Sequence, residues 1–114
     1  MTLAKGEVVD VNLGNPPNEI KGHEQAFKRP CVVIRGFENL GLAIVNPLTS
    51  KRPEYSFYTI VKLHKGSGGL TTDSYALCHQ IRTISLDRVI SKRAKLDDKN
   101  IWKIHAVLID TLEI

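Results

Sequence analysis

The sequence predicts a mainly β protein, a small antiparallel barrel followed by a C-terminal helix. Short runs of valine, isoleucine and aromatic residues recur along the chain, separated by loops rich in glycine, proline and asparagine. A helical repeat of apolar residues occurs only near the C-terminus. About five short strands, joined locally, favour an antiparallel barrel over a parallel α/β sheet. With 114 residues, we expect a single domain spanning 1–114.

The first half of the chain contains three expected strands and one long loop. Apolar and polar residues alternate over residues 6–13, as in a half-buried strand. Residues 14–30 follow, and their glycine, asparagine and paired prolines exclude regular structure. Loops of this length in compact domains are usually functional or mobile. Short apolar strands are expected at 31–36 and at 41–48, the second stopped by Pro47.

The second half opens with the clearest strand pattern, residues 55–63, where aromatic and β-branched residues prevail. A glycine-rich loop separates this strand from a last long strand, expected at residues 74–84. Ser85 can then cap one helical turn within 85–90.

A C-terminal helix completes the expected fold. Asp97 is the expected N-cap, and Leu96 and Ile101 have the spacing of a hydrophobic staple. Apolar residues then recur at the i, i+3, i+4 and i+7 spacing of an amphipathic helix packed on the sheet. The expected packing face consists of Ile101, Ile104, His105, Leu108 and Leu112. We also expect Trp102 to take part in helix packing.

Composition and charge limit the possible partners. The chain has 16 Lys and Arg residues against 12 Asp and Glu residues, a net charge of +4 that mildly favours a polyanionic partner such as nucleic acid. Cys31 and Cys78 lie in apolar runs, so we expect buried thiols rather than a disulfide. No Cys/His cluster has ligand spacing, so we expect no metal and no cofactor. No segment resembles a signal peptide or a transmembrane helix, which favours a cytoplasmic protein without a membrane partner.

Four short motifs occur in order along the chain: "GEVVDVNL", "GHEQAFKRP", "VNPLTS" and "CHQIRTI". Together, and followed by a terminal helix, they resemble the MazF/PemK family, the ribonuclease toxins of bacterial type II toxin–antitoxin pairs. The resemblance covers nearly the whole chain and implies an SH3-like or plasmid-maintenance-toxin barrel that forms a homodimer. It also implies a metal-independent, sequence-selective endoribonuclease that cuts single-stranded mRNA and is inhibited by a cognate antitoxin.

The chemistry implied by this resemblance uses the ribose 2′-OH as nucleophile and leaves a 2′,3′-cyclic phosphate and a 5′-OH. It needs a base, an acid and positive charge on the phosphorane. The resemblance assigns the phosphate to Arg29, with Thr49 opposite it and Ser50 able to share that role. Without the resemblance, Arg29 could be a solvated residue before a strand, and the Thr49 hydroxyl could close a turn.

The long loop supplies further candidates. His23 titrates near neutrality, and the resemblance makes it a candidate base or acid; an exposed histidine without a catalytic role is the alternative. Glu24 could act as the base instead, and Glu24 and Gln25 are expected to shape the loop and contact RNA. Phe27 can stack on a base, and Lys28 adds positive charge beside it.

The last motif departs from the family pattern. Relatives with aspartate at the position of His79 give it a catalytic part, so that scheme does not transfer to this chain. We expect His79 to contact a base, with acid–base catalysis as the open alternative. Arg82 is implied to support the strand end and the dimer next to the RNA. The basic run at 88–95 could follow the RNA backbone or form a solvated face.

Two other functions remain open for such a barrel. It could act as a gyrase poison that binds protein through its terminal helix, or as a catalytically silent RNA-binding module. The segment before "GHEQ" is longer than the family commonly shows, and this leaves the cleavage preference open.

Overall fold

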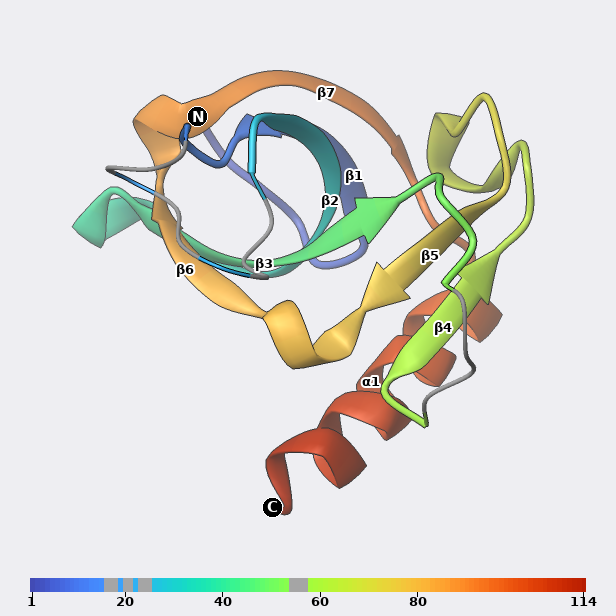
Figure 1. The fold of residues 1–114 in the computed structure, drawn as a ribbon. Helices are drawn as coiled ribbons and strands as arrows, with labels where there is room; N and C mark the ends of the chain where they lie inside the picture. The colour runs from blue at the N-terminus through green and yellow to red at the C-terminus, as the bar shows by residue number, and fades with distance from the viewer. Residues whose placement is uncertain (16–18, 20–21, 23–25, 54–57) are drawn as a thin grey trace.

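The computed structural model describes residues 1–15, 19, 22, 26–53 and 58–114. Within them the chain forms a seven-stranded antiparallel sheet and one C-terminal helix (Figure 1), which confirms the predicted fold class. The strands are β1 (Glu7–Asn12), β2 (Lys28–Phe37), β3 (Leu42–Thr49), β4 (Ile60–Leu63), β5 (Ser74–Leu77), β6 (Arg82–Ser85) and β7 (Val89–Lys95). The helix is α1 (Asp98–Leu112), and the 3₁₀ turns are η1 (Glu38–Leu40), η2 (Ser67–Gly69), η3 (Cys78–Gln80) and η4 (Leu86–Arg88).

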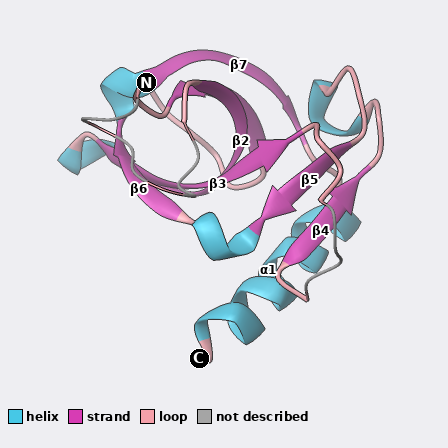
Figure 2. Cartoon of the chain, in the orientation of Figure 1, coloured by secondary structure: helices cyan, strands magenta, loops and turns pink. Residues whose placement is uncertain are grey.

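The sheet curls into a ring and then opens at one side. Its strand order is β4-β5-β3-β2-β1-β7, and β6 also pairs with β3. In Figure 1, β1, β2, β3, β6 and β7 surround one space, whereas the end of β3 leaves the ring to join β5 and β4 beside α1. Figure 2 shows the short turn η2 next to the end of β7, far from it in sequence.

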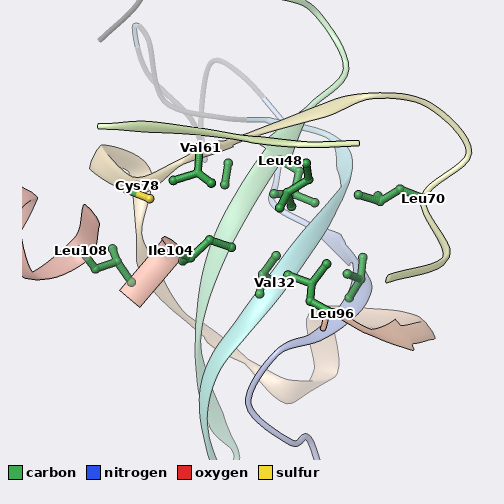
Figure 3. Close-up of a cluster of buried hydrophobic side chains, with 11 residues drawn as sticks. Val32, Leu48, Val61, Leu70, Cys78, Leu96, Ile104 and Leu108 are labelled. Carbon is green, nitrogen blue, oxygen red and sulfur yellow. The ribbon is translucent and has the colours of Figure 1, made fainter. Parts of the chain in front are cut away.

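Two apolar clusters stabilise this arrangement, because successive side chains of a strand face opposite sides of the sheet. One cluster, the barrel core, fills the ring, and the other, the helix core, lies between the sheet and α1. The barrel core comprises Leu3, Val9, Val11, Leu13, Cys31, Val33, Ala43, Val45, Ile84 and Val89. The helix core comprises Val8, Val32, Leu48, Val61, Leu63, Leu70, Ala76, Cys78, Leu96, Ile104 and Leu108. Figure 3 shows Ile104 and Leu108 of α1 lying against this cluster.

The long strand β3 corrects the expectation that Pro47 stops a strand. The strand continues through Pro47 to Thr49, and Pro47 pairs with Cys31 of β2. On its other side β3 pairs with β6 as far as Val45 and with β5 from Leu48 onward. Pro47 lies in the interval between these two partners. Because proline has no N–H to donate, this interval is where a proline disturbs the ladder least.

Two other expected strands are also shorter or broken. Of the strand expected at 55–63, only Ile60–Leu63 is a strand; Tyr58 and Thr59 form a turn, and 55–57 lie outside the described residues. The strand expected at 74–84 is broken by η3 into β5 and β6. The break follows from β3, which pairs with both halves at different positions and leaves η3 between them.

Strand β7 was not expected from the sequence. Of its seven residues only Val89 is buried, so the segment lacks the apolar alternation by which strands are recognised. It pairs with β1 along one edge, and the register shifts between Glu7 and Val9 and again between Asp10 and Val11. The expected turn before it is confirmed, because the Ser85 hydroxyl accepts a hydrogen bond from the Asp87 N–H at 3.3 Å.

The C-terminal helix is confirmed, including its start. The Asp97 carboxylate accepts from the Asn100 N–H at 2.8 Å, as an N-cap should, and Ile104 and Leu108 are buried. His105 and Leu112 are both exposed, so their place on the packing face was wrong. Trp102 is also exposed, at 65%, and touches the His105 ring edge-on rather than the sheet. The helix therefore packs through a narrower stripe than its sequence pattern predicts.

Both cysteines are free and buried, as expected. Burial raises the pKa of the Cys31 thiol to about 12 and that of Cys78 to about 11, so neither is a reactive thiolate at neutral pH. Among the described residues, no helix has the length and apolar character needed to cross a membrane.

The glycine-rich loop after β4 is fixed by close packing at Gly68. This residue is buried with φ +57°, and a Cβ there would collide with the side chains of Val8 and Leu96. Its neighbour Gly69 would place a Cβ 3.3 Å from the Cβ of Arg93 on β7. Because only glycine fits these contacts, the loop lies directly on β1 and β7.

We predict that Gly68→Ala destabilises the fold by about 3 kcal/mol, combining a left-handed backbone with overpacking. Gly41→Ala is the matched control, since Gly41 has φ +65° but a methyl group on its Cα would meet nothing within 4 Å. Gly41→Ala should lower the free energy of unfolding by about 1 kcal/mol, from the left-handed backbone alone. Thermal unfolding followed by circular dichroism compares the two, at about 4 °C per kcal/mol. Equal melting temperatures would contradict tight packing at Gly68.

Candidate functional site

The long loop leaves the barrel between β1 and β2, and its base is closed by the backbone. The Leu13 N–H donates to the Phe27 carbonyl at 2.8 Å, and the Phe27 N–H donates to the Gly14 carbonyl at 2.7 Å. Phe27 has φ +64°, a left-handed conformation unusual outside glycine, and its side chain is 54% exposed. The loop base therefore presents an aromatic ring to solvent directly before β2.

Arg29 lies at the start of β2. The strand begins at Lys28, earlier than expected, because Lys28 and Arg29 pair with Asn12 and Val11 of β1. The Arg29 Nε donates to the Ala26 carbonyl at 3.2 Å, which uses one of the five N–H groups of the guanidinium. The side chain is partly buried and is thus oriented by the strand and by the loop base, rather than simply solvated.

Thr49 ends β3, and Ser50 follows it directly. The pairing of β3 with β2 ends at Pro47 and Cys31, and beyond this point Thr49 pairs with Tyr75 of β5. The Thr49 Oγ1 accepts from the Lys51 N–H at 3.2 Å, which is the turn-closing bond considered above as the alternative role. A hydroxyl that accepts one hydrogen bond can still donate its own proton. The turn therefore orients the Thr49 hydroxyl and leaves its hydrogen available for donation to another group.

A cleft of about 190 Å³ opens beside these strand ends. Its charged and polar lining was only partly expected: Lys28, Arg29 and Ser50 were site candidates from the sequence, and Arg93 belongs to the basic run at 88–95. The unexpected polar lining residues are Thr71, Thr72 and Ser74. Among the described residues that line it, three are cations and none is a carboxylate, so the cleft suits an anionic ligand.

Arg93 is fixed by an ion pair across β1 and β7. Its Nε and Nη2 donate to the Asp10 carboxylate at 3.2 and 2.9 Å, and the Ser91 hydroxyl donates to the same group at 2.8 Å. Burial acts to raise the pKa of Asp10, but the hydrogen bonds from Arg93 and Ser91 outweigh it and hold the pKa below its usual value. The basic run at 88–95 was recognisable in the sequence. The pairing of β7 with β1 that brings Arg93 to Asp10 could not be predicted from it.

Thr71, Thr72 and Ser74 reach the cleft because of the packed glycine loop. Ser74 is buried, and its hydroxyl donates to the Thr72 carbonyl at 3.1 Å, which fixes the end of the loop. Thr71 and Thr72 are exposed. The paired threonines after a run of glycines were a usable signal, since such loops often place polar groups against a ligand.

Two other candidates lie elsewhere on the barrel. His79 is exposed in η3, and its Nδ1 lies 2.8 Å from the Thr59 hydroxyl. Arg82 donates from Nη1 to the Leu13 carbonyl at 3.4 Å, which places it against the base of the long loop. Arg88 donates to the Asn12 carbonyl at 3.2 Å next to it. Both arginines therefore hold backbone carbonyl groups where β1 ends and the long loop begins.

His23, Glu24 and Gln25 lie outside the described residues, so their positions relative to Arg29 are not part of this geometry. Within the described part of the chain, no three His, Cys, Asp or Glu side chains form a group that could hold a metal ion.

Comparison with known proteins identifies the family. The family described as the PemK-like, MazF-like toxin of type II toxin–antitoxin systems matches residues 4–112. Endoribonuclease EndoA of Bacillus subtilis is 31% identical over 111 residues, covering 95% of this chain and 92% of EndoA. Endoribonuclease MazF of Staphylococcus saprophyticus is 28% identical over 106 residues, covering 90% and 85%.

Solved structures agree on the fold. MazF from Deinococcus radiodurans superposes with a TM-score of 0.81 at 22% identity, covering 100% of this chain and 99% of that one. A mycobacterial endoribonuclease, solved in complex with its cognate antitoxin, gives a TM-score of 0.75 at 17% identity, covering 99% and 97%. The barrel, the order of its motifs and the match over residues 4–112 lead to one conclusion: the chain belongs to the PemK-like, MazF-like family of type II toxin–antitoxin toxins.

Proposed function

We propose that this chain is the toxin of a type II toxin–antitoxin pair and a metal-independent, sequence-selective endoribonuclease. Its substrate is single-stranded mRNA in the cytoplasm, and one domain carries the activity. The observation that carries the proposal is the position of Arg29, oriented at the start of β2 on a cleft that Ser50 also lines and whose described lining contains no carboxylate. The relatives from Bacillus subtilis and Staphylococcus saprophyticus are named endoribonucleases, which supports the same activity here.

The reaction begins with attack of a ribose 2′-oxygen on the adjacent phosphorus. The bond from that oxygen to phosphorus forms, the bond to the 5′-oxygen breaks, and a 2′,3′-cyclic phosphate and a 5′-OH result. Charge accumulates on the phosphorane oxygens, where the guanidinium of Arg29 and the hydroxyl of Thr49 donate hydrogen bonds. One such preorganised donor lowers the barrier by about 3 kcal/mol. Arginine stays protonated, so its role is stabilisation rather than proton transfer.

Proton transfer falls to the long loop. His23 takes the 2′-OH proton or supplies one to the 5′-oxygen, with Glu24 as the alternative base. His79 contacts an RNA base, and the hydrogen bond between its Nδ1 and the Thr59 hydroxyl leaves Nε2 for this contact.

RNA binding uses the residues around this centre. Phe27 is exposed at the loop base and can stack on a base, while Lys28 and Ser50 line the cleft. Glu24 and Gln25 contact bases from the loop. Arg82 acts through the Leu13 carbonyl that it holds at the loop base.

The cognate antitoxin inhibits by covering the RNA site. A cleft lined by cations attracts an acidic peptide for the same electrostatic reason that it attracts RNA. Structural neighbours support an antitoxin partner, since they include a mycobacterial endoribonuclease with its cognate antitoxin and a MazE–MazF pair from Deinococcus radiodurans.

We predict that the purified chain cuts single-stranded RNA in EDTA and leaves 5′-OH ends. Arg29→Ala should lower kcat by on the order of 100-fold or more, because it removes a donor to the phosphorane. The 5′ ends are mapped by direct phosphorylation, without prior phosphatase treatment.

Arg35→Ala is the control for that experiment. Arg35 is an exposed arginine of the same strand, and its guanidinium lies 4.9 Å from the centre of the Phe37 ring. The Arg35 variant should cut as the wild type does. Cuts with 5′-phosphate ends, a requirement for divalent metal, or equal activity in both variants would contradict the proposal. Intact RNA together with inhibition of gyrase would favour the protein-binding alternative.

We predict that His23→Ala lowers kcat by roughly 10²- to 10⁴-fold, the usual contribution of a general acid or base. His79→Ala should leave kcat within a few-fold and raise KM. His64→Ala, at an exposed loop histidine, serves as the control. The pH dependence of kcat gives a second readout, since its limb near neutrality should disappear in the His23 variant alone. A collapse of kcat in His79→Ala, with His23→Ala fully active, would reverse the assignment.

We predict a homodimer, supported by an apolar face of α1 that the single chain leaves exposed. Trp102, Ile109 and Leu112 lie on this face and are 65%, 40% and 47% exposed. Sedimentation velocity should give twice the chain mass of 12.7 kDa, and Trp102→Glu should shift the population to monomer. Lys103→Glu, the adjacent exposed position, should not. A monomeric wild type, or a dimeric Trp102 variant, would contradict this face.

A further inference from the structure

We infer that Arg93 forms a second phosphate subsite in the cleft and binds an RNA phosphate that flanks the scissile one. The inference rests on the proposed function, because it assigns the RNA backbone as ligand. It concerns a residue that the motifs do not include, on the strand that the sequence pattern did not reveal.

The carboxylate of Asp10 determines which edge of the Arg93 guanidinium is free. Asp10 receives the Nε and Nη2 hydrogen bonds, at 3.2 and 2.9 Å. A guanidinium has two edges that can bind an oxyanion in bidentate fashion, one through Nε and Nη2 and one through both terminal nitrogens. Asp10 occupies the first, so the second, with three N–H groups left, can meet a phosphate.

The ion pair does not cancel the attraction of the cleft for an anion. Asp10 is also bonded to the Ser91 hydroxyl at 2.8 Å, and it is not among the residues that line the cleft, whereas Arg93 is. The cleft therefore presents the guanidinium and keeps the carboxylate behind it. A carboxylate in this position fixes the direction of the arginine, which reduces the side-chain entropy lost when a phosphate binds.

Neighbouring groups complete the subsite. The glycine loop lies against Arg93, with a Cβ at Gly69 falling 3.3 Å from the Arg93 Cβ, and it brings the exposed Thr71 and Thr72 to the same cleft. Figure 2 shows this loop and the end of β7 side by side. The cleft volume of about 190 Å³ equals about six water molecules at roughly 30 Å³ each, which is room for a phosphate and part of its sugar.

Arg29 and Arg93 then contact different phosphates of one strand. They come from β2 and β7, which are separated in the sheet by β1, and both line the cleft. Since both arginines line this one cleft, an RNA strand that lies in it meets two guanidinium groups.

The test couples each arginine to one phosphate. Each phosphate of an oligoribonucleotide around the cleavage site is replaced in turn by an uncharged methylphosphonate, and kcat/KM is measured for the wild type and Arg93→Gln. In the wild type, replacement at one flanking position should lower kcat/KM by about tenfold, the value of one charged contact. On unmodified RNA, Arg93→Gln should lower kcat/KM about tenfold, mainly through KM. Replacing the phosphate at that flanking position should not lower kcat/KM of this variant further. Asp10→Asn should weaken the same coupling.

Lys92→Gln is the matched control on the same strand. Its Nζ donates to the Thr2 carbonyl at 2.9 Å and pairs with Glu7 at 3.4 Å, away from the cleft. This variant removes one positive charge and should keep both kcat/KM and the coupling. The inference is wrong if Arg93→Gln lowers kcat/KM by the same factor on every modified substrate, or if it changes only the melting temperature. Arg93 would then only connect β1 to β7.

A binding measurement separates this inference from the proposed chemistry. Affinity for single-stranded RNA is followed by fluorescence anisotropy against salt concentration, which needs no cleavage. Loss of one phosphate contact should reduce the slope of log K against log salt by about 0.7 for Arg93→Gln and leave it unchanged for Lys92→Gln. If RNA is bound with this difference but never cut, the chemistry fails and the subsite stands. If Arg93→Gln weakens only antitoxin binding, the subsite belongs to the antitoxin peptide and the inference is overturned.

Discussion

The fold depends on the way β3 shares its two edges among three strands. One edge pairs with β2, and the other pairs first with β6 and then with β5. Pairing with β6 closes the ring around the barrel core, and pairing with β5 extends the sheet to β4 and α1. The exchange occurs around Asn46 and Pro47, where a missing N–H matters least.

The same change of partner along β3 also brings the polar side chains of the cleft close to one another. Because β3 continues past the ring, Ser50 lines the same cleft as the start of β2 and the loop that follows β4. The glycine loop is fixed on β1 and β7 by contacts that only glycine allows, so its threonines face the same cleft as Arg29. A rigid sheet thus positions the charges, while the long segment between β1 and β2 is anchored at its base by Phe27 and Arg82. This division suits an enzyme whose catalysis rests on preorganised charge.

Features that depend on a few neighbouring residues could be predicted from the sequence. The alternation in β1, the cap at Asp97 and the "KRP" arginine were recognisable because each depends on a few neighbouring residues. The break at η3 was not, because it follows from pairing with β3 rather than from the residues of η3. Strand β7 and the Asp10–Arg93 pair escaped for a similar reason: an exposed edge strand has no apolar alternation, and register across 83 residues has no signal in one sequence. Trp102 was misassigned because helical spacing does not say which face meets the sheet.

In the proposed mechanism, side chains around Arg29 drive attack by a 2′-OH on the adjacent phosphorus. The most direct measurement uses an RNA in which one 2′-OH, at the cleavage site, is replaced by hydrogen. In EDTA, the mechanism predicts that this RNA binds as tightly as the unmodified strand and is not cut there, whereas neighbouring 2′-deoxy substitutions leave cleavage intact. Cleavage of the modified position at an unchanged rate would contradict the mechanism, because the nucleophile would then be water rather than the ribose.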